Sequence, residues 1–167
     1  MTDVFTSQLA SARRNEKTFD SRALPPLYGT RELVIDIRRL RSAWKRYRKA
    51  RQRRAIYDFL GEIFEVVAIW RSDGHADGRT RRVMYRRGCE SQKDIEPFRD
   101  LIVAISHPVK LERRTVAKWT RVLRYADEYK VPGKPLDQFV MRRGGINGCA
   151  SLYTRRLGRK SKSTKKN

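Results

Sequence analysis

A strongly basic stretch, residues 38–54 (RRLRSAWKRYRKARQRR), constrains this chain more than any other feature. Ten of its seventeen residues are Lys or Arg, and no carboxylate, Gly or Pro occurs from Ile37 to Tyr57. A continuous helix is expected, because nothing in the stretch interrupts one. Leu40 and Trp44 recur at helical spacing, which predicts a narrow buried stripe with cations on the remaining faces. Such a surface repels itself unless a polyanion lies against it, and nucleic acid is the expected polyanion.

The cations of this stretch are the first candidate nucleic-acid-binding residues. They are Arg38, Arg39, Arg41, Lys45, Arg46, Arg48, Lys49, Arg51, Arg53 and Arg54. If the helix continues, Arg51 and Arg54 extend the direction of the stripe that contains Trp44. Arginines are rarely core residues, so we expect these two side chains to contact phosphate.

Residues 30–71 as a whole have the pattern of one long helical segment. A first apolar stripe includes Leu33 and Leu40, and a second extends from Ile56 to Trp70, well over a quarter turn away. Either the helix bends or breaks between the two stripes, or one long helix buries different faces at its two ends. The absence of a helix breaker favours the single long helix.

Net charge limits the partners of the chain. Its 167 residues carry a formal charge of +22, which predicts binding to DNA, RNA or anionic lipid at low salt. A hydrophobic content of 39% permits a modest core. No apolar run approaches the ~18 residues of a membrane span, so no membrane partner is expected. Cys89 and Cys149 are too few for a disulfide framework, so an intracellular, reducing location is predicted, cytoplasmic or nucleoid-associated.

Residues 72–93 are rich in Gly, Asp and Arg and are predicted to form a basic loop or a short hairpin. Val83 and Tyr85 alternate with other residues, as in a strand that reaches toward phosphate, while a mobile basic loop fits the sequence equally well. The candidate binding residues in this segment are Arg79, Arg81, Arg82, Arg86 and Arg87.

Residues 94–157 are predicted to form a C-terminal helical module. Asp94 is the expected cap of a helix that ends at His107, and a second helix follows from about Glu112 to Lys130. The pair resembles a helix-turn-helix unit, although its turn is longer than usual. A plain packed pair of helices is the alternative.

The second of these helices has an apolar and a polar face. The residues expected to be buried are Val116, Trp119, Leu123 and Ala126. Tyr125 is expected on the opposite face, with Arg114, Lys118 and Arg121. The candidate base- and phosphate-contacting residues are Arg114, Thr115, Lys118 and Arg121.

The last part of the module contains a glycine-rich turn. A helix is predicted to begin with Leu136 to Met141, and Gly144 or Gly145 is its expected C-terminal cap. A short helix, residues 149–157, is predicted to follow. The alternative is that these glycines hold a phosphate on their backbone N–H groups.

Catalytic and cofactor sites are not expected. Asp73, His75 and Asp77 alternate as at the start of a calcium loop, but Met84 stands where that loop needs its bidentate Glu. The chain has two histidines and no closely spaced set of zinc ligands. No metal, cofactor or enzymatic activity is therefore predicted.

These patterns together predict a mainly α fold. Residues 30–157 are expected to form a single helical domain between a flexible arm, residues 1–29, and a disordered basic tail, residues 158–167. The predicted function is non-enzymatic nucleic-acid binding, with DNA preferred to RNA. An RNA-binding assembly protein of ribosomal type is one alternative. An oligomeric interaction or scaffold protein is another, since Trp44 and Trp70 lie on different helix faces.

Overall fold

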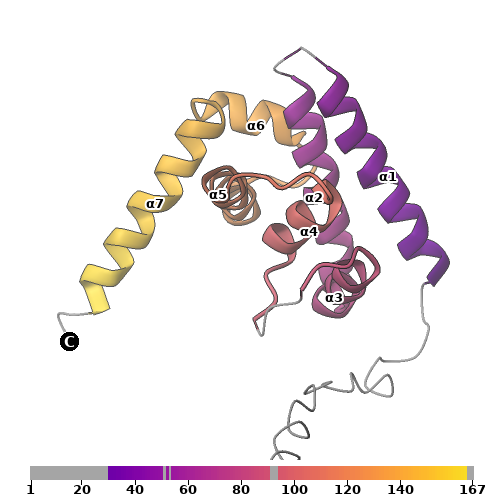
Figure 1. Ribbon diagram of the computed structural model, residues 1–167. Helices are drawn as coiled ribbons and strands as arrows, with labels where there is room; N and C mark the ends of the chain where they lie inside the picture. Colours follow the sequence, from indigo (N-terminus) through magenta and orange to yellow (C-terminus); the bar gives the residue numbers. More distant parts are fainter. Residues whose placement is uncertain (1–29, 51, 53, 91–93, 165–167) are drawn as a thin grey trace, which may run out of the picture.

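The computed structural model describes residues 30–50, 52, 54–90 and 94–164, with side chains described from residue 31 to residue 158. Within these residues the chain forms seven α-helices and no strand, which confirms the predicted mainly α fold (Figure 1). The helices are α1 Thr30–Lys49, α2 Ala55–Ser72, α3 Ala76–Arg86, α4 Pro97–Ser106, α5 Arg113–Tyr129, α6 Leu136–Arg142 and α7 Gly145–Thr164. The predicted arm, residues 1–29, lies outside the described residues. None of the described helices is both long and apolar enough to cross a membrane.

The segment predicted as one long helix is two antiparallel helices, so that prediction was wrong. α1 ends at Lys49 and α2 begins at Ala55, and the two helices lie side by side (Figure 1). The two apolar stripes of this segment can face each other only if the chain turns back on itself. Burial of Trp44 against Phe59, with ring centroids 5.1 Å apart, is part of the contact that outweighs the local preference for a continuous helix.

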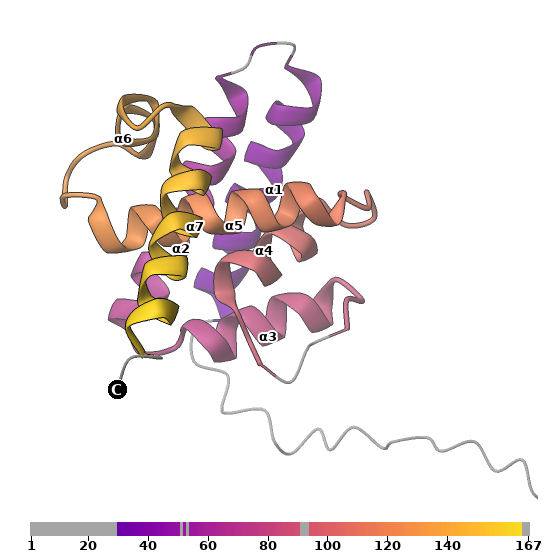
Figure 2. The ribbon, with the colours of Figure 1, turned by 90° about the vertical axis from the view of Figure 1, so that its left-hand side faces the viewer.

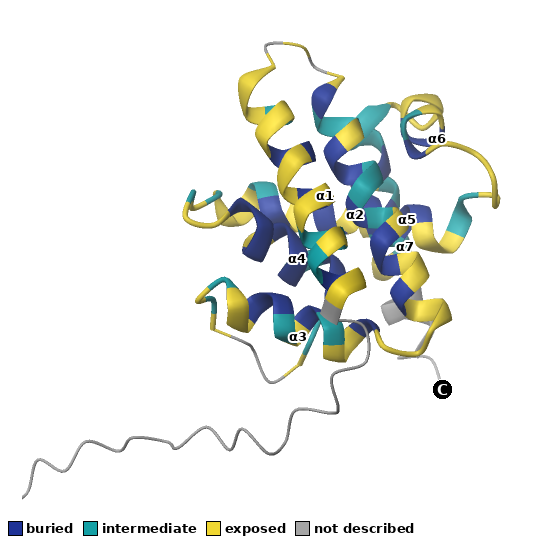
Figure 3. Ribbon diagram, turned by 90° about the vertical axis from the view of Figure 1, so that its right-hand side faces the viewer, coloured by how far each residue is buried: buried dark blue, intermediate teal, exposed yellow. Residues whose placement is uncertain are grey.

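A cluster of aromatic side chains joins three helices at the core. Trp44 and Tyr47 of α1 contact Phe59 of α2, and Trp119 of α5 meets both Tyr47 and Phe59 edge-on, at 5.9 and 6.1 Å between centroids. Tilted and edge-on contacts of this kind stabilise aromatic pairs beyond simple area burial. The cluster fixes α1 on the core, with its outer face exposed to solvent (Figure 3).

Much of the segment predicted as a loop or hairpin is helix α3, so that prediction was also wrong. Ala76, Thr80, Val83 and Met84 are buried, and their spacing of four, three and one places them on one helical face. Tyr85, whose alternation with Val83 suggested a strand, is 65% exposed. The buried face of α3 includes a small residue and a polar residue, and many arginines lie between them. The helical period of apolar residues was therefore not visible in the sequence. Residues 91–93 of this segment lie outside the described residues.

Glu96 caps the start of α4, so the prediction that Asp94 caps this helix was wrong. The Glu96 carboxylate accepts the backbone N–H of Arg99 at 2.7 Å, and the buried Asp100 carboxylate accepts the backbone N–H of Glu96 at 2.9 Å. This reciprocal arrangement resembles a capping box, and Pro97 occupies the first helical position, where its missing N–H costs nothing. Asp94 lies just outside the helix.

α5 has nearly the predicted bounds and the predicted buried face. Val116, Trp119, Leu123 and Ala126 are all buried. Tyr125, predicted on the solvent side, is buried as well. Its ring lies 4.7 Å from that of Tyr129 and 5.9 Å from that of Phe139 on α6, because α6 packs where sequence periodicity predicted solvent.

A glycine corner separates α6 from α7. Gly144 has φ +84°, which confirms the predicted glycine cap. At Gly148 a Cβ atom would lie 2.0 Å from the backbone oxygen of Arg143, so this corner requires a glycine. α7 starts at Gly145 and continues to Thr164, longer than the predicted helix. The predicted disorder of residues 158–164 was therefore wrong, because the Lys- and Arg-rich sequence beyond Leu157 sustains a helix. Residues 165–167 lie outside the described residues.

Candidate nucleic-acid interface

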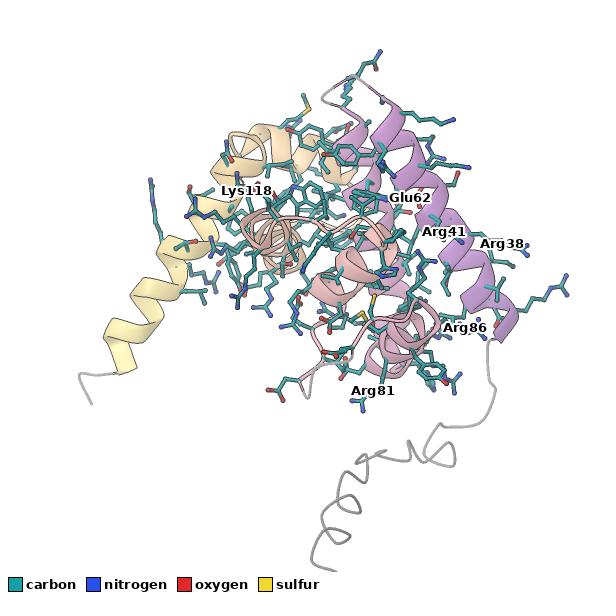
Figure 4. All side chains as sticks on the ribbon, viewed as in Figure 1. Arg38, Arg41, Glu62, Arg81, Arg86 and Lys118 are labelled. Atoms are coloured by element: carbon teal, nitrogen blue, oxygen red, sulfur yellow. The ribbon has the colours of Figure 1, made fainter. Side chains whose placement is uncertain are left out.

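A stripe of exposed cations follows α1 beside its buried face. We call Arg38, Arg41, Lys45 and Arg48 the α1 stripe, and all four are exposed. Their spacing of three, four and three residues places them on one side of the helix, one turn apart. Figure 4 shows Arg38 projecting away from the core. Because the adjacent face of α1 is buried, the direction of the stripe is fixed by packing.

The α1 stripe forms one wall of a groove of about 660 Å³, the α1 groove. The facing wall is the end of α4 and the residues after it. The lining residues are Arg38, Arg41, Ser42, Trp44, Lys45, Arg48, Lys49, Arg87, Ile105, Ser106, His107, Pro108 and Val109. The peptide bond between His107 and Pro108 is cis. Sequence reasoning predicted the cations of α1 but not this facing wall, which comes from a segment more than fifty residues away.

Arg87 stabilises the facing wall through hydrogen bonds to two backbone carbonyls. Its Nε donates to the carbonyl oxygen of Ala104 at 3.2 Å, and its guanidinium also donates to the carbonyl of His107. Carbonyls at a helix C-terminus lack intrahelical donors and carry a partial negative charge, which would repel a phosphate. Arg87 was predicted as a phosphate contact in a loop. In the structure it lines the groove while it neutralises the end of α4.

Acidic residues are absent from the described lining of the α1 groove. The ion pairs formed by carboxylates in the described part of the chain lie elsewhere. The cations in these pairs are Arg39, Arg71, Arg79, Arg99, Arg124 and Arg156. None of these arginines belongs to the α1 stripe. The charge of the stripe is therefore not neutralised by an ion pair within the described residues.

Arg39 differs from its neighbours on α1. Its guanidinium forms ion pairs with Glu62 and, at 2.5 Å, with Glu65, both on α2. Burial acts to lower the pKa of Arg39, but the hydrogen bond to Glu65 and the charge of Glu62 outweigh it and raise the pKa above its usual value. Arg39 was predicted to contact phosphate, whereas the structure uses it to join α1 to α2.

The remaining cations of the basic run have separate positions. Arg46 is exposed and donates to Ser42 Oγ at 3.1 Å. Arg51 and Arg53 lie outside the described residues. Arg54 is exposed and precedes α2. The expectation that Arg54 extends the direction of Trp44 along one helix was wrong, because α1 ends before it.

The predicted arginines of the 79–87 segment lie on or next to α3. Arg79 forms an ion pair with Asp73 at 2.8 Å. Arg82 is partly buried, while Arg81 and Arg86 are exposed and project into solvent (Figure 4). α3 therefore presents two exposed cations near the molecule's edge rather than a continuous basic loop.

A second groove, of about 480 Å³, lies between α5 and α7, and we call it the α5–α7 groove. Its lining residues are Lys118, Arg121, Asn147, Ala150, Ser151, Thr154 and Arg155. Lys118 and Arg121 were predicted as nucleic-acid contacts; Arg155 and Asn147 were not. Asn147, Ser151 and Arg155 are spaced by four residues, which places them on one helix face. This spacing was the sequence signal that could have predicted the α7 wall of the groove. Arg114 is exposed and Thr115 half-buried, and neither lines this groove.

The position of α7 bears on the helix-turn-helix prediction. α7 packs against α5 and crosses it on its outward side, as Figures 1 and 2 show from perpendicular directions. A recognition helix must present an open face to the major groove. Here Lys118 and Arg121 line a groove whose other wall consists of side chains of α7.

Both cysteines have free thiols. Burial raises the pKa of Cys149 to about 11, and it raises the pKa of Cys89 despite the opposing charge of Arg87. Among the described residues, no group of three His, Cys, Asp or Glu side chains is placed to hold a metal ion.

In comparisons with protein-family models, with curated proteins and with solved structures, none matched this chain. The two grooves, with their geometry and charge, are therefore the basis on which a function can be proposed.

Proposed function

We propose that this protein is a non-enzymatic DNA-binding protein that holds the phosphate backbone of a duplex in the α1 groove. The observation that supports this proposal is the α1 stripe, an acid-free row of exposed cations on a helix that is fixed by its buried face. Such a row has no partner within the described residues and is complementary to a line of phosphates.

The dimensions of the stripe fit a duplex. Arg38 and Arg48 are ten residues apart, so the stripe extends for ~15 Å along α1 at ~1.5 Å per residue. One strand of B-DNA carries a phosphate every ~3.4 Å along its axis, so about four phosphates of a strand lie within that length. Three of the four cations are arginines, whose planar guanidinium groups bind phosphate oxygens in pairs.

Base recognition by Arg114, Lys118 and Arg121 is the competing proposal for α5. It would place α5 in the major groove, and α7 lies across the outward side of α5 (Figure 2). The exposed position of Arg114, beyond the lining of the α5–α7 groove, supports it. The proposed backbone-binding role of the α1 groove does not depend on base recognition by α5.

The test uses charge reversal in the α1 groove. Arg41→Glu combined with Lys45→Glu should weaken binding to a duplex of about 30 base pairs by at least about tenfold, measured by fluorescence anisotropy at fixed salt. The matched control is Lys134→Glu with Arg142→Glu. These are exposed cations that line neither groove, and the change in net charge is identical.

The outcomes separate the alternatives. If both double variants lose the same affinity, net charge rather than the α1 groove drives binding. If the unaltered protein does not bind the duplex, the proposed function is wrong. Tighter binding to a structured RNA than to the duplex at the same salt would support the RNA-binding alternative, because A-form RNA offers the same phosphates with a different groove shape.

A further inference from the structure

We propose that the α5–α7 groove is a second phosphate-backbone site, and that one molecule of this protein bridges two DNA duplexes. This inference rests on the proposed function, because it assigns the α1 groove to the first duplex. The bridging activity itself depends on the second groove and on its place in the fold.

The second groove has the composition of an anion site. Lys118 and Arg121 from α5 face Arg155 from α7 across it, and Asn147 and Ser151 add neutral hydrogen-bond donors. Its described lining contains no acidic residue. A phosphate backbone suits such a mixture, since its contacts come from Lys and Arg together with Asn and Ser side chains.

Both carboxylates of α5 form ion pairs away from the groove lining. Glu128 of α5 pairs with Arg156 of α7 at 3.1 Å, and Asp127 pairs with Arg71 of α2. These pairs hold α5 against α7 and α2 without neutralising the cations that line the groove. The groove cations consequently resemble the α1 stripe, in which the charge is also unpaired within the described residues.

Both walls of the second groove pack into the core. On α5, Val122 and Leu123 are fully buried, and on α7, Cys149 is fully buried and Tyr153 is 7% exposed. Each wall is thus anchored by its own buried face. Ala150 lines the groove between these anchors and leaves room for a backbone to approach.

The outer helices of the two grooves, α7 and α1, lie on different sides of the molecule. Figures 2 and 3 view it from opposite sides; α7 is nearest the viewer in the first and α1 in the second. Figure 4 accordingly shows Lys118 on the opposite side of the core from Arg38 and Arg41. One duplex that served both grooves would have to bend around the protein.

Bending is the less favourable arrangement. Duplex DNA has a persistence length of about 150 base pairs, so bending a site of about 20–30 base pairs around the protein has an elastic cost. Two straight duplexes, one in each groove, avoid this cost. The geometry therefore favours bridging over wrapping.

A capture assay tests the proposal. One duplex of about 30 base pairs is fixed to beads, and a second, fluorescent duplex is added with the protein at low salt. The unaltered protein should retain the fluorescent duplex on the beads. Lys118→Glu with Arg121→Glu should still bind the bead duplex, within about threefold of the unaltered protein, but should retain at least about fivefold less fluorescent duplex.

Two further variants make the result specific. Arg155→Glu changes the other wall of the same groove and should also reduce capture, so the conclusion does not depend on one variant remaining folded. Lys134→Glu with Arg142→Glu lines neither groove and should capture the fluorescent duplex as well as the unaltered protein does. Circular dichroism checks that each variant keeps its helices.

Several outcomes would overturn the inference. One is undiminished capture by both α5–α7 variants, which would mean that bridging arises from oligomers of the protein. Another is failure of the unaltered protein to capture a second duplex although it binds the first, and this result would leave the proposed function intact. A third is increased energy transfer between dyes at the two ends of one duplex at a one-to-one ratio, which would indicate wrapping. If no duplex is retained by the protein at all, the proposed function itself fails.

Discussion

The indole N–H of Trp70 donates a 2.8 Å hydrogen bond to a carboxylate oxygen of Asp36. This bond joins the last turn of α2 to the first half of α1, and Trp70 is fully buried. It therefore sets the alignment of the helix pair that carries the α1 stripe.

Replacing this donor should destabilise the fold. Trp70→Phe leaves the half-buried Asp36 carboxylate without its partner, so we expect the free energy of unfolding to fall by about 1–3 kcal/mol in urea denaturation. Asp36→Asn keeps an acceptor oxygen at the same place and should cost less. Equal stability of Trp70→Phe and the unaltered protein would show that the bond contributes nothing to the pairing of α1 with α2.

The affinity for DNA should fall steeply with salt. We expect about six or more phosphate contacts and hence a slope of at least about −5 in log affinity against log salt, at about −0.9 per contact. Arg41→Gln with Lys45→Gln should make the slope shallower by about 2. Arg39→Gln is the control and should leave the slope unchanged, because Arg39 is paired with Glu62 and Glu65. A slope shallower than about −3 for the unaltered protein would contradict the proposed number of contacts.

Binding of α5 variants to different sequences separates backbone contact from base recognition. If the α5–α7 groove binds phosphates, Arg121→Ala and Lys118→Ala should change binding to a selected site and to scrambled DNA by the same small factor, within about threefold, at one salt concentration. Base recognition predicts instead a loss of about 1–3 kcal/mol at the selected site and almost none on scrambled DNA. Both substrates should be measured with each variant, since only their difference is informative.

Two glycine substitutions should have opposite effects on stability. Gly148→Ala places a Cβ 2.0 Å from the backbone oxygen of Arg143, so the α6–α7 corner must shift, at an expected cost of at least about 1–3 kcal/mol. Gly61→Ala within α2 meets nothing within 4 Å and should stabilise the protein by about 0.5–1 kcal/mol. Thermal unfolding of the two variants checks both expectations; a stable Gly148→Ala protein would mean that the corner adapts.

Cys149 should make the fold sensitive to alkaline pH. Burial raises the pKa of its thiol to about 11, while an unfolded chain has a thiol pKa of about 8.5. The unfolded state therefore loses this proton first, and stability present below about pH 8.5 should decline as the pH rises toward 11. Cys149→Ala should show a smaller decline over this range in urea denaturation. If stability declines equally in Cys149→Ala and in the unaltered protein, the pH dependence comes from titratable groups other than Cys149.

Helices α4 and α5 could be predicted because their signals are local. Pro97 at a helix start, the stop at His107 and the regular apolar spacing around Trp119 all act within a few residues of the sequence. The turn between α1 and α2 could not be predicted in the same way. No breaker marks it, and it forms because Trp44 and Phe59 pack together across the helix pair.

The cationic face of the candidate site was predictable, but the use of each cation was not. Arg39 and Arg41 are two residues apart and look equivalent in sequence. Arg39 forms ion pairs with Glu62 and Glu65, more than twenty residues away, and so joins α1 to α2. Arg41 instead lines the α1 groove. The groove itself depends on Arg87 holding the end of α4, a tertiary contact with no local signature.

The α1 stripe also couples the free energy of folding to the ionic surroundings. Like charges one helical turn apart repel each other over a screening length of about 10 Å at 0.1 M salt, and this repulsion opposes the winding of the last turns of α1. Raising the salt concentration relieves it in the free protein while it weakens the complex. A polyanion in the groove relieves it by attraction and adds to stability as its concentration exceeds the dissociation constant. Under the proposed function, a bound nucleic acid would serve this helix as a counterion and would supply the negative charge that the chain omits between Ile37 and Tyr57.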